Sequence, residues 1–143
     1  PLHPNYIKEM LFSKYTALPY DKKHHNCERR FCYFTSRVAV IGKHEGSSLN
    51  QTIYQGHRAK ISCMAVHRTK MIVATGEACQ NPQIHVWSTL SCGLLCKTKT
   101  YHQNGILHLK FSYDGVYLIS VGHDRNYTIQ VTDWKNGTII AVR

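Results

Sequence analysis

The stretch that decides the fold reads GHRAKISCMAVH at residues 56–67, VATG at 73–76 and IHVWS at 84–88. It combines a Gly-His turn with three short runs rich in β-branched and apolar residues, as expected of consecutive strands. Two of its side chains make strong demands on their surroundings. A half-buried imidazole at His57 needs partners for both ring nitrogens, and a buried indole at Trp87 needs an acceptor for its N–H group.

This pattern resembles a WD repeat, the four-stranded blade of a β-propeller. In that family the Gly-His histidine, a Ser or Thr of the second strand, an Asp of the next turn and the third-strand Trp form one hydrogen-bonded chain. The resemblance places His57, Thr75 and Trp87 at three of these four positions. The Asp is missing, and Gln80 and Asn81 are the polar residues expected to stand in for it.

A second copy of the pattern follows about 45 residues later, at the period of such blades. Its strands are expected over 106–112, 116–122 and 128–133. Here His102 takes the place of His57, and Asp124 takes the position of the turn Asp. Val121 replaces the Ser or Thr, and Thr132 replaces the Trp. We therefore expect that the full polar chain does not form in this copy and that His102 and Asp124 find other partners.

Four consecutive parts are expected along the chain: an N-terminal extension over 1–25, later strands of a preceding blade over 26–55, a WD-like blade over 56–100 and a second, degenerate blade over 101–143. The extension is expected to form a short helix from about Asn5 to Tyr15, as a docking segment or as part of a linker. Further strands are expected over 31–41, 49–54, 94–100 and 138–142, with a turn over 42–48.

The expected fold class is all-β, a fragment of a WD-repeat β-propeller with about two and a half four-stranded blades. One blade cannot bury both faces of its sheet, so we expect further blades of the same parent chain to pack against these. The alternative is a free-standing small β domain, which would leave large apolar faces in water. The chain starts without Met or a signal-peptide pattern, so it is expected to begin inside a longer protein. No apolar run predicts a membrane span.

The net charge of the chain is +10, and the excess runs through its whole length. Such a balance suits an acidic partner such as a tubulin surface, nucleic acid or anionic lipid; the alternative is a solubilising surface balanced elsewhere in a longer chain. The aromatic residues fall mostly at strand positions, which disfavours nucleic acid. The candidate basic residues for partner binding are Arg58, Lys60, Lys97 and Lys99.

The cysteines and histidines do not predict a metal site. The six cysteines contain no CxxC pair, and without a secretory signal they are expected to be reduced thiols in the cytosol. His24, His25, Cys27 and Cys32 lie close together in sequence, but they lack the second ligand pair that zinc sites usually have. We expect no metal and no cofactor.

An enzymatic function is not predicted either. His57, Ser120 and Asp124 are the residue types of a catalytic triad, but they belong to different repeats, and no GxSxG motif surrounds the serine. We expect no catalytic residues. His67, His85 and His108 lie on or beside strands and are expected to be satisfied surface or core histidines.

A narrower resemblance covers residues 26–143. The stretches that carry it are Asn26-Cys27 with the apolar strand pair that leads to residues 54–57, then 61–67, 74–76 and 81–87, and finally 121–124 with 131–137. These look like the hydrophobic HELP segment and first repeats of the echinoderm microtubule-associated protein-like family. The sequence departs from the repeat pattern at Ser88, Val121 and Thr132, which leaves room for a divergent relative such as a ciliary WD-repeat protein.

The resemblance implies a non-catalytic, cytoskeletal role, in which propeller surfaces bind tubulin, microtubules or other axonemal proteins. It also implies a location in the cytoplasm, on the cytoskeleton or in the ciliary axoneme. The alternative is a general WD-repeat adaptor for a peptide or a ribonucleoprotein assembly. A basic disc would be attracted to an acidic tubulin lattice, and salt should weaken that attraction.

Overall fold

The computed structural model describes residues 16–17, 30–45 and 47–143. The helix expected over 5–15 and the loop with His24, His25 and Cys27 lie outside these residues. Every regular element in the described part of the chain is a β-strand, which confirms the all-β prediction. The described residues contain no helix with the length and hydropathy needed to cross a membrane.

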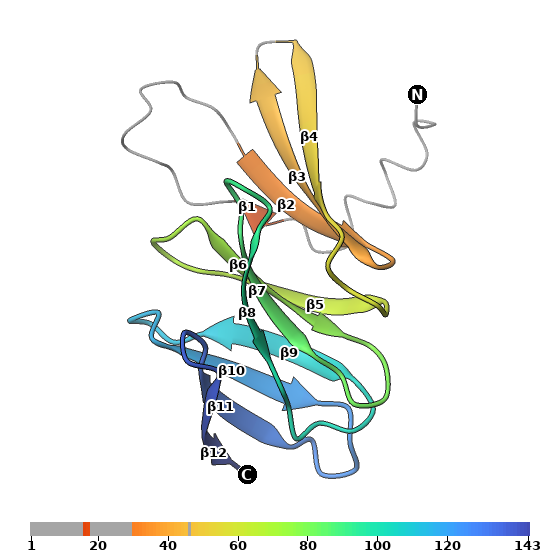
Figure 1. Ribbon diagram of the computed structural model, residues 1–143, viewed down its shortest axis with the longest axis vertical. Coiled ribbons are helices and arrows are strands. Elements are labelled where there is room, and N and C mark those ends of the chain that lie inside the picture. The colour runs from red at the N-terminus through yellow and green to blue at the C-terminus, as the bar shows by residue number, and fades with distance from the viewer. Residues whose placement is uncertain (1–15, 18–29, 46) are drawn as a thin grey trace.

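The strands form three antiparallel sheets that follow one another along the chain (Figure 1). Sheet A has the order β1-β2-β3-β4, with β1 Thr16–Ala17, β2 Arg30–Thr35, β3 Val38–Glu45 and β4 Ser48–Tyr54. Sheet B has the order β5-β6-β7-β8, with β5 Ile61–Val66, β6 Ile72–Glu77, β7 Ile84–Ser88 and β8 Leu94–Thr98. Sheet C has the order β12-β11-β10-β9, with β9 Ile106–Phe111, β10 Tyr117–Gly122, β11 Ile129–Asp133 and β12 Thr138–Val142.

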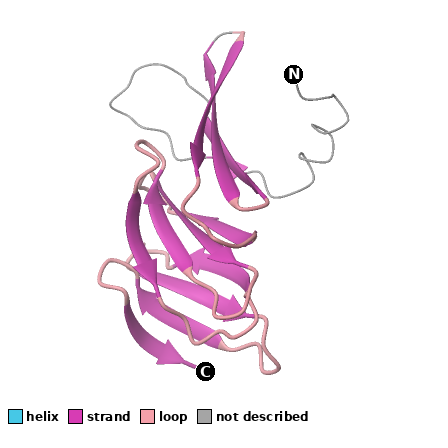
Figure 2. Ribbon diagram, turned by 45° about the vertical axis from the view of Figure 1, so that its right-hand side comes forward, coloured by secondary structure: helices cyan, strands magenta, loops and turns pink. Residues whose placement is uncertain are grey.

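Sheets B and C repeat the same register. Val73 pairs with Trp87 across β6 and β7, and Leu118 pairs with Thr132 across β10 and β11, at one constant interval along the chain. Thr132 therefore occupies the position of Trp87. The two inner strands, β5 and β9, lie against each other where the two sheets meet. Figure 2 shows the stack of sheets from a second direction.

Sheet B is covered on both faces, and this explains the burial of its middle strands. Successive residues of a strand point to opposite faces. One face packs on sheet C in a core that includes Ala74, Val86 and Ile106. The other packs on sheet A in a core that includes Val73 and Trp87. The exposed sides of the stack are the outer strands, such as β8, where Leu94, Leu95 and Lys97 are open to solvent.

Sheet A differs from the sequence expectation in two ways. It is a four-stranded sheet, because the short β1 pairs with β2, so the described residues form three sheets rather than two and a half. The turn expected over 42–48 is also wrong, because β3 runs on to Glu45 and β4 begins at Ser48. Gly42 lies inside β3, where a Cβ atom would overlap the Phe31 ring of β2. The glycine therefore allows close packing on the sheet and does not mark a turn.

Candidate functional site

A buried polar network connects the Gly-His turn to two strands of sheet B. His57 lies in the connection between β4 and β5, Thr75 on β6 and Trp87 on β7. Nε2 of His57 is 2.6 Å from Oγ1 of Thr75, and Nε1 of Trp87 donates to the same hydroxyl over 3.1 Å. Trp87 and Thr75 are fully buried. The hydroxyl thus donates to the imidazole and accepts from the indole, so that it acts both as a hydrogen-bond donor and as an acceptor.

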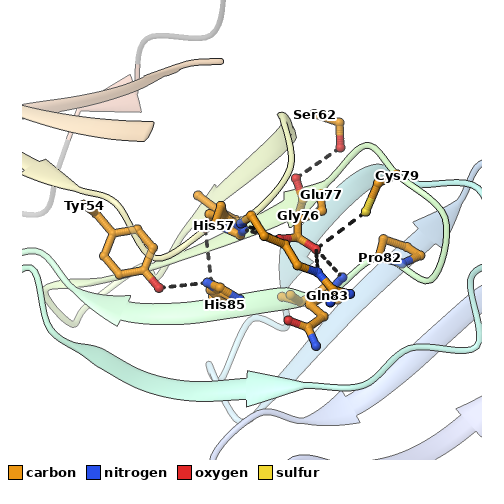
Figure 3. A network of polar contacts seen from close by, with 12 residues as sticks. Tyr54, His57, Ser62, Gly76, Glu77, Cys79, Pro82, Gln83 and His85 are labelled. Carbon is orange, nitrogen blue, oxygen red and sulfur yellow. Dashed lines mark hydrogen bonds and ion pairs between the residues drawn. The ribbon is translucent and has the colours of Figure 1, made fainter. Parts of the chain in front are cut away.

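The acidic member of this network is Glu77, and the expectation that Gln80 or Asn81 would fill that place is wrong. Oε1 of Glu77 lies 3.2 Å from Nδ1 of His57, and the carboxylate is fully buried at the end of β6. It also accepts from the backbone amides of Arg58, over 3.3 Å, and Gln83, over 3.0 Å. Figure 3 shows Cys79 and Gln83 reaching toward this carboxylate.

Asn81 has a different role, which involves only its backbone. Its amide donates to the carbonyl of Gln103 in the next loop, and its φ is 50°.

The sequence signal that could have identified Glu77 is the strand period of two, because Thr75 and Glu77 point to the same face of β6. Glutamate is one methylene longer than aspartate, so it reaches His57 from the strand without help from the turn.

Two residues extend the network in a way that the repeat pattern does not predict. The hydroxyl of Tyr54, at the end of β4, lies 2.8 Å from Nδ1 of His85 on β7 (Figure 3). The ring of Tyr54 stacks on Trp87 at 4.7 Å, and the ring of His57 stacks on His85 at 4.0 Å. The network therefore joins sheet A to sheet B. The sequence leaves open whether His85 lies on the surface or in the core. The structure places it in the core, with 1% of its surface exposed.

Burial keeps both histidines of the network neutral. Burial, followed by the nearby His57 and Lys97, lowers the pKa of His85 to about 4. Burial likewise lowers the pKa of His57, although Glu77 opposes the change. Burial alone would raise the pKa of Glu77, but the amide of Gln83 and the ring of His57 outweigh it, and the pKa is lowered. The carboxylate is therefore ionised and holds a proton on Nδ1 of His57.

His57, Glu77 and His85 also bring three potential metal-ligand atoms within 4.8 Å of one another. Their geometry does not suit a shared metal. The two imidazoles are stacked at 11°, so their in-plane lone pairs run parallel, whereas zinc needs lone pairs that converge at about 2.0–2.1 Å. The carboxylate of Glu77 is already engaged by two backbone amides. These residues act as an internal support that fixes the Gly-His turn.

Sheet C contains a shortened version of the network. Nε2 of His102 lies 2.8 Å from Oγ of Ser120, so the expectation that Val121 takes the Ser or Thr position is wrong. Oδ2 of Asp124 is 3.8 Å from Nδ1 of His102, an ion-pair distance that is too long for a hydrogen bond. The hydroxyl of Thr132, at the Trp position, accepts from the side chain of Gln130 over 2.8 Å. The polar chain therefore includes His102 and Ser120 but has no indole.

Asp124 mainly organises its own loop. Its Oδ1 accepts from the amides of Asn126 and Thr128 and from the hydroxyl of Thr128. These hydrogen bonds lower the pKa of Asp124. The side chain of Gln130, which occupies the position of His85, accepts from the amide of Tyr101 over 2.9 Å. The two blades thus use the same positions with different chemistry.

The predicted basic residues lie on the surface near one end of the sheets. Because the strands alternate in direction, the connections β2–β3, β4–β5, β6–β7, β8–β9 and β10–β11 lie at this end, which we call the network end. Arg58 and Lys60 lie in the β4–β5 connection, and Lys97 and Lys99 lie at the end of β8 and just after it; all four are exposed.

The surface at the network end is hollowed between sheets A and B. An open hollow of about 350 Å³ is lined by Arg37, Val38, Gln55 and His57. Arg58 contacts the network beneath, since its Nε lies 4.0 Å from Oε2 of Glu77 while its side chain remains 64% exposed. The basic surface and the buried network therefore share the β4–β5 connection.

Comparisons with known proteins agree with this architecture. The family described as "WD domain, G-beta repeat" matches residues 48–88 and 93–129, more than half of the chain. The first matched segment runs from β4, the outer strand of sheet A, through β7 of sheet B. The second runs from β8, the outer strand of sheet B, to the first residue of β11 in sheet C. The chain belongs to the WD-repeat family.

Several relatives of the chain are named as echinoderm microtubule-associated proteins or as proteins like them. It is 28% identical to "Echinoderm microtubule-associated protein-like 4" of Xenopus laevis over 120 residues, which cover 76% of this chain and 13% of that protein. It is 27% identical to the "77 kDa echinoderm microtubule-associated protein" of Strongylocentrotus purpuratus over 112 residues, 72% of this chain and 16% of that protein.

A third similarity points in the same direction. The chain is 25% identical to "Centriole proteome protein 16" of Chlamydomonas reinhardtii over 144 aligned residues, 78% of this chain and 7% of that protein. The chain thus spans less than a fifth of the length of each of these relatives.

Proposed function

We propose that this chain is part of a non-catalytic scaffold that binds tubulin or other axonemal proteins through propeller surfaces. The observation that carries the proposal is the agreement between the repeat architecture and relatives that are named as microtubule-associated. The similarity to a protein named for the centriole proteome supports a place on the cytoskeleton, including the cilium, within the cytoplasm.

A scaffolding role fits the chemistry of the buried network. His57, Thr75 and Glu77 have side chains that catalysis could use, but they are buried and bonded to one another. Removing them from this network would leave polar groups unsatisfied inside the blade. These side chains therefore support the structure, and binding falls to the surface residues.

The proposed contact surface is the basic network end, with Arg58, Lys60, Lys97 and Lys99. Exposed cations on a rigid base attract an acidic surface at long range, and salt weakens that attraction. The rigid base is provided by the network, which fixes the β4–β5 connection through Glu77. We propose that further blades of the parent chain complete the disc on which this surface lies.

The test is cosedimentation of the full-length protein with microtubules. We expect pelleting at low salt that falls as salt rises, and we expect the triple variant Arg58→Glu, Lys97→Glu, Lys99→Glu to pellet several-fold less. A comparison variant with the same change in net charge reverses Arg68, Lys70 and Lys135 at the opposite end and should keep clearly more pelleting than the network-end variant.

Two results would count against this function. Absence of pelleting at low salt would remove the microtubule role, and a pull-down dominated by RNA or signalling proteins would favour the general adaptor. Equal loss in both triple variants would show that net charge alone drives pelleting, and the network end would lose its assignment.

A further inference from the structure

The other end of the sheets carries a rigid junction between sheets B and C. This end, which we call the turn end, contains the β5–β6, β7–β8, β9–β10 and β11–β12 turns. Nδ1 of His67 accepts from the amides of Thr69 and Lys70 in the β5–β6 turn, over 3.2 and 3.1 Å. Its Nε2 lies 3.2 Å from the carbonyl oxygen of Gly115 in the β9–β10 turn. The indole of Trp134 donates to that same oxygen over 2.9 Å.

The protonation of His67 follows from these partners. Because Nδ1 accepts from two backbone amides, the ring proton is on Nε2 and is donated to Gly115. Burial, as the largest cause, lowers the pKa of His67, so the ring stays neutral. His67 and Trp134 are 2% and 5% exposed, so one carbonyl oxygen joins three turns beneath the surface. The turns are held in place before any partner arrives.

A cationic and aromatic cluster lies on this junction. The guanidinium of Arg68 is 4.3 Å from the ring centroid of Tyr113, which connects the β5–β6 turn to the β9–β10 turn. Tyr113 is nevertheless 83% exposed. The ammonium groups of Lys70 and Lys135 lie 5.9 and 6.0 Å from the ring centroid of Trp134. Arg68, Lys70 and Lys135 are all exposed.

The neighbouring acidic groups are committed to their own turns. Oδ1 of Asp114 accepts from the hydroxyl of Ser112 and the amide of Val116. The carboxylate of Asp133 accepts from the amide of Lys135 and the side chain of Asn136. Three cations and an exposed tyrosine therefore remain available to a partner, and tyrosine and arginine are residue types that dominate binding energy at interfaces.

We propose that Arg68, Lys70, Tyr113 and Lys135, the turn-end cluster, form a second docking surface, which binds an acidic peptide segment of another protein. Carboxylates of the peptide pair with the three cations, and its chain packs on the exposed ring of Tyr113. This surface is independent of the network end and would let one blade pair hold two partners. A peptide fits better than nucleic acid, because Tyr113 is the one strongly exposed tyrosine in the described part of this end, at 83% against 38% for Tyr117, whereas single-stranded nucleic acid stacks its bases on successive aromatic rings.

The experiment measures binding of a fluorescein-labelled polyglutamate peptide to the full-length protein by fluorescence anisotropy at fixed salt. The charge arm compares Arg68→Gln with Lys135→Gln, made together, against Arg125→Gln with Arg143→Gln, which removes the same charge at exposed positions that belong to neither set of proposed binding residues. The neutral arm compares Tyr113→Ala with Tyr101→Ala, since Tyr101 is 65% exposed near the network end. All six positions are exposed, so the variants should fold.

We expect the turn-end double variant to bind about threefold to tenfold more weakly, and Tyr113→Ala to bind about threefold more weakly, with less than twofold change in either control. Equal losses in the two double variants, or no loss in Tyr113→Ala, would overturn the proposal. Tighter binding of a single-stranded oligonucleotide than of polyglutamate at the same salt would also overturn it. None of these outcomes depends on microtubule pelleting, so the two proposals can fail separately.

Discussion

His85 is the residue whose setting differs most from that of an ordinary histidine. It is buried to 1% exposure, stacked on His57 and bonded at Nδ1 to the hydroxyl of Tyr54. Among the described residues its Nε2 has no hydrogen-bond partner. A proton added to this ring would place a charge in a buried site near Lys97, which is why its pKa is lowered to about 4. The blade therefore needs a neutral imidazole at this position.

The residue-scale prediction concerns acid stability. The folded pKa of His85 lies below its ordinary value of 6.5, so the unfolded chain binds the proton more readily. The free energy of unfolding should have its full value above about pH 6.5 and should fall as pH drops toward 4. Protonation of this residue in the unfolded chain accounts for a loss of up to about 3 kcal/mol. The lowered pKa values of His57 and His102 act in the same direction. Thermal unfolding of the full-length protein between pH 7.5 and 4.5 measures the effect.

A substitution taken from the next blade isolates the contribution of His85. Gln130 occupies the equivalent position in sheet C, so His85→Gln introduces a side chain that this architecture accepts. We expect this variant to lose less stability on acidification than the parent protein. His123→Gln, at an exposed position of the β10–β11 loop, is the control and should follow the parent. An unchanged acid slope in His85→Gln would show that other groups dominate.

Part of the network could be read from the sequence. The positions of His57, Thr75 and Trp87 follow from the repeat pattern. Glu77 was missed because the pattern directs attention to the turn, whereas a longer side chain can reach from the strand. Tyr54 was missed because its partners belong to the next sheet, and local sequence does not specify how two sheets stack. Residues that connect one repeat to the next can therefore be identified only from the structure.

At the scale of single elements, the β9–β10 turn is defined by Gly115. Its φ is 71°, in the region that favours glycine, and an added Cβ would overlap the ring of His67. Gly115→Ala should therefore destabilise the protein, both through backbone strain and by pushing His67 away from the carbonyl that it shares with Trp134. Denaturant unfolding of the purified full-length protein would measure the change.

Gly137 provides the matched control for this element. Its φ is 69°, but the nearest atom to an added Cβ is Sγ of Cys96 at 3.8 Å, an ordinary contact. Both alanine variants carry the same backbone strain, and only Gly115→Ala adds the overlap. We expect Gly115→Ala to be less stable than Gly137→Ala by about 1–3 kcal/mol, the usual range for overpacking. Equal stabilities would mean that the junction at His67 contributes little.

Strand positions were predictable where short runs rich in apolar and β-branched residues lie between turn signals, as in β5, β6 and β12. The β3–β4 hairpin is harder to predict, because glycine, here Gly42, is a common turn signal in sequence. Its place under the ring of Phe31 depends on pairing with β2, which sequence spacing alone does not reveal. Trp134 shows the opposite case, a residue of an expected turn that packs into the core through its bond to Gly115.

At the scale of the molecule, sheet C has one face against sheet B and one that points away. Ile119, Val121, Ile129 and Val131 alternate with the buried positions and pair across β10 and β11 on the second face. They are only half-buried or exposed. We propose that the next blade of the parent chain covers them. The expected result is strong binding of the dye ANS by this chain when it is produced alone.

A longer product serves as the control for this expectation. Extending the chain through the next repeat of the parent sequence should lower ANS fluorescence per molecule and sharpen the unfolding transition, because the apolar face is then covered. Weak ANS binding by the chain alone, with cooperative unfolding, would contradict the proposed stacking and would support the free-standing β domain.

The double coverage of sheet B has a consequence for how such a protein can evolve. A substitution in β6 or β7 meets two neighbouring sheets at once, whereas a substitution in β8 meets mainly solvent. Substitutions are therefore tolerated mostly in the outer strands and in the loops, where partners are recognised. The lineage can acquire new ligands there while its interior stays fixed.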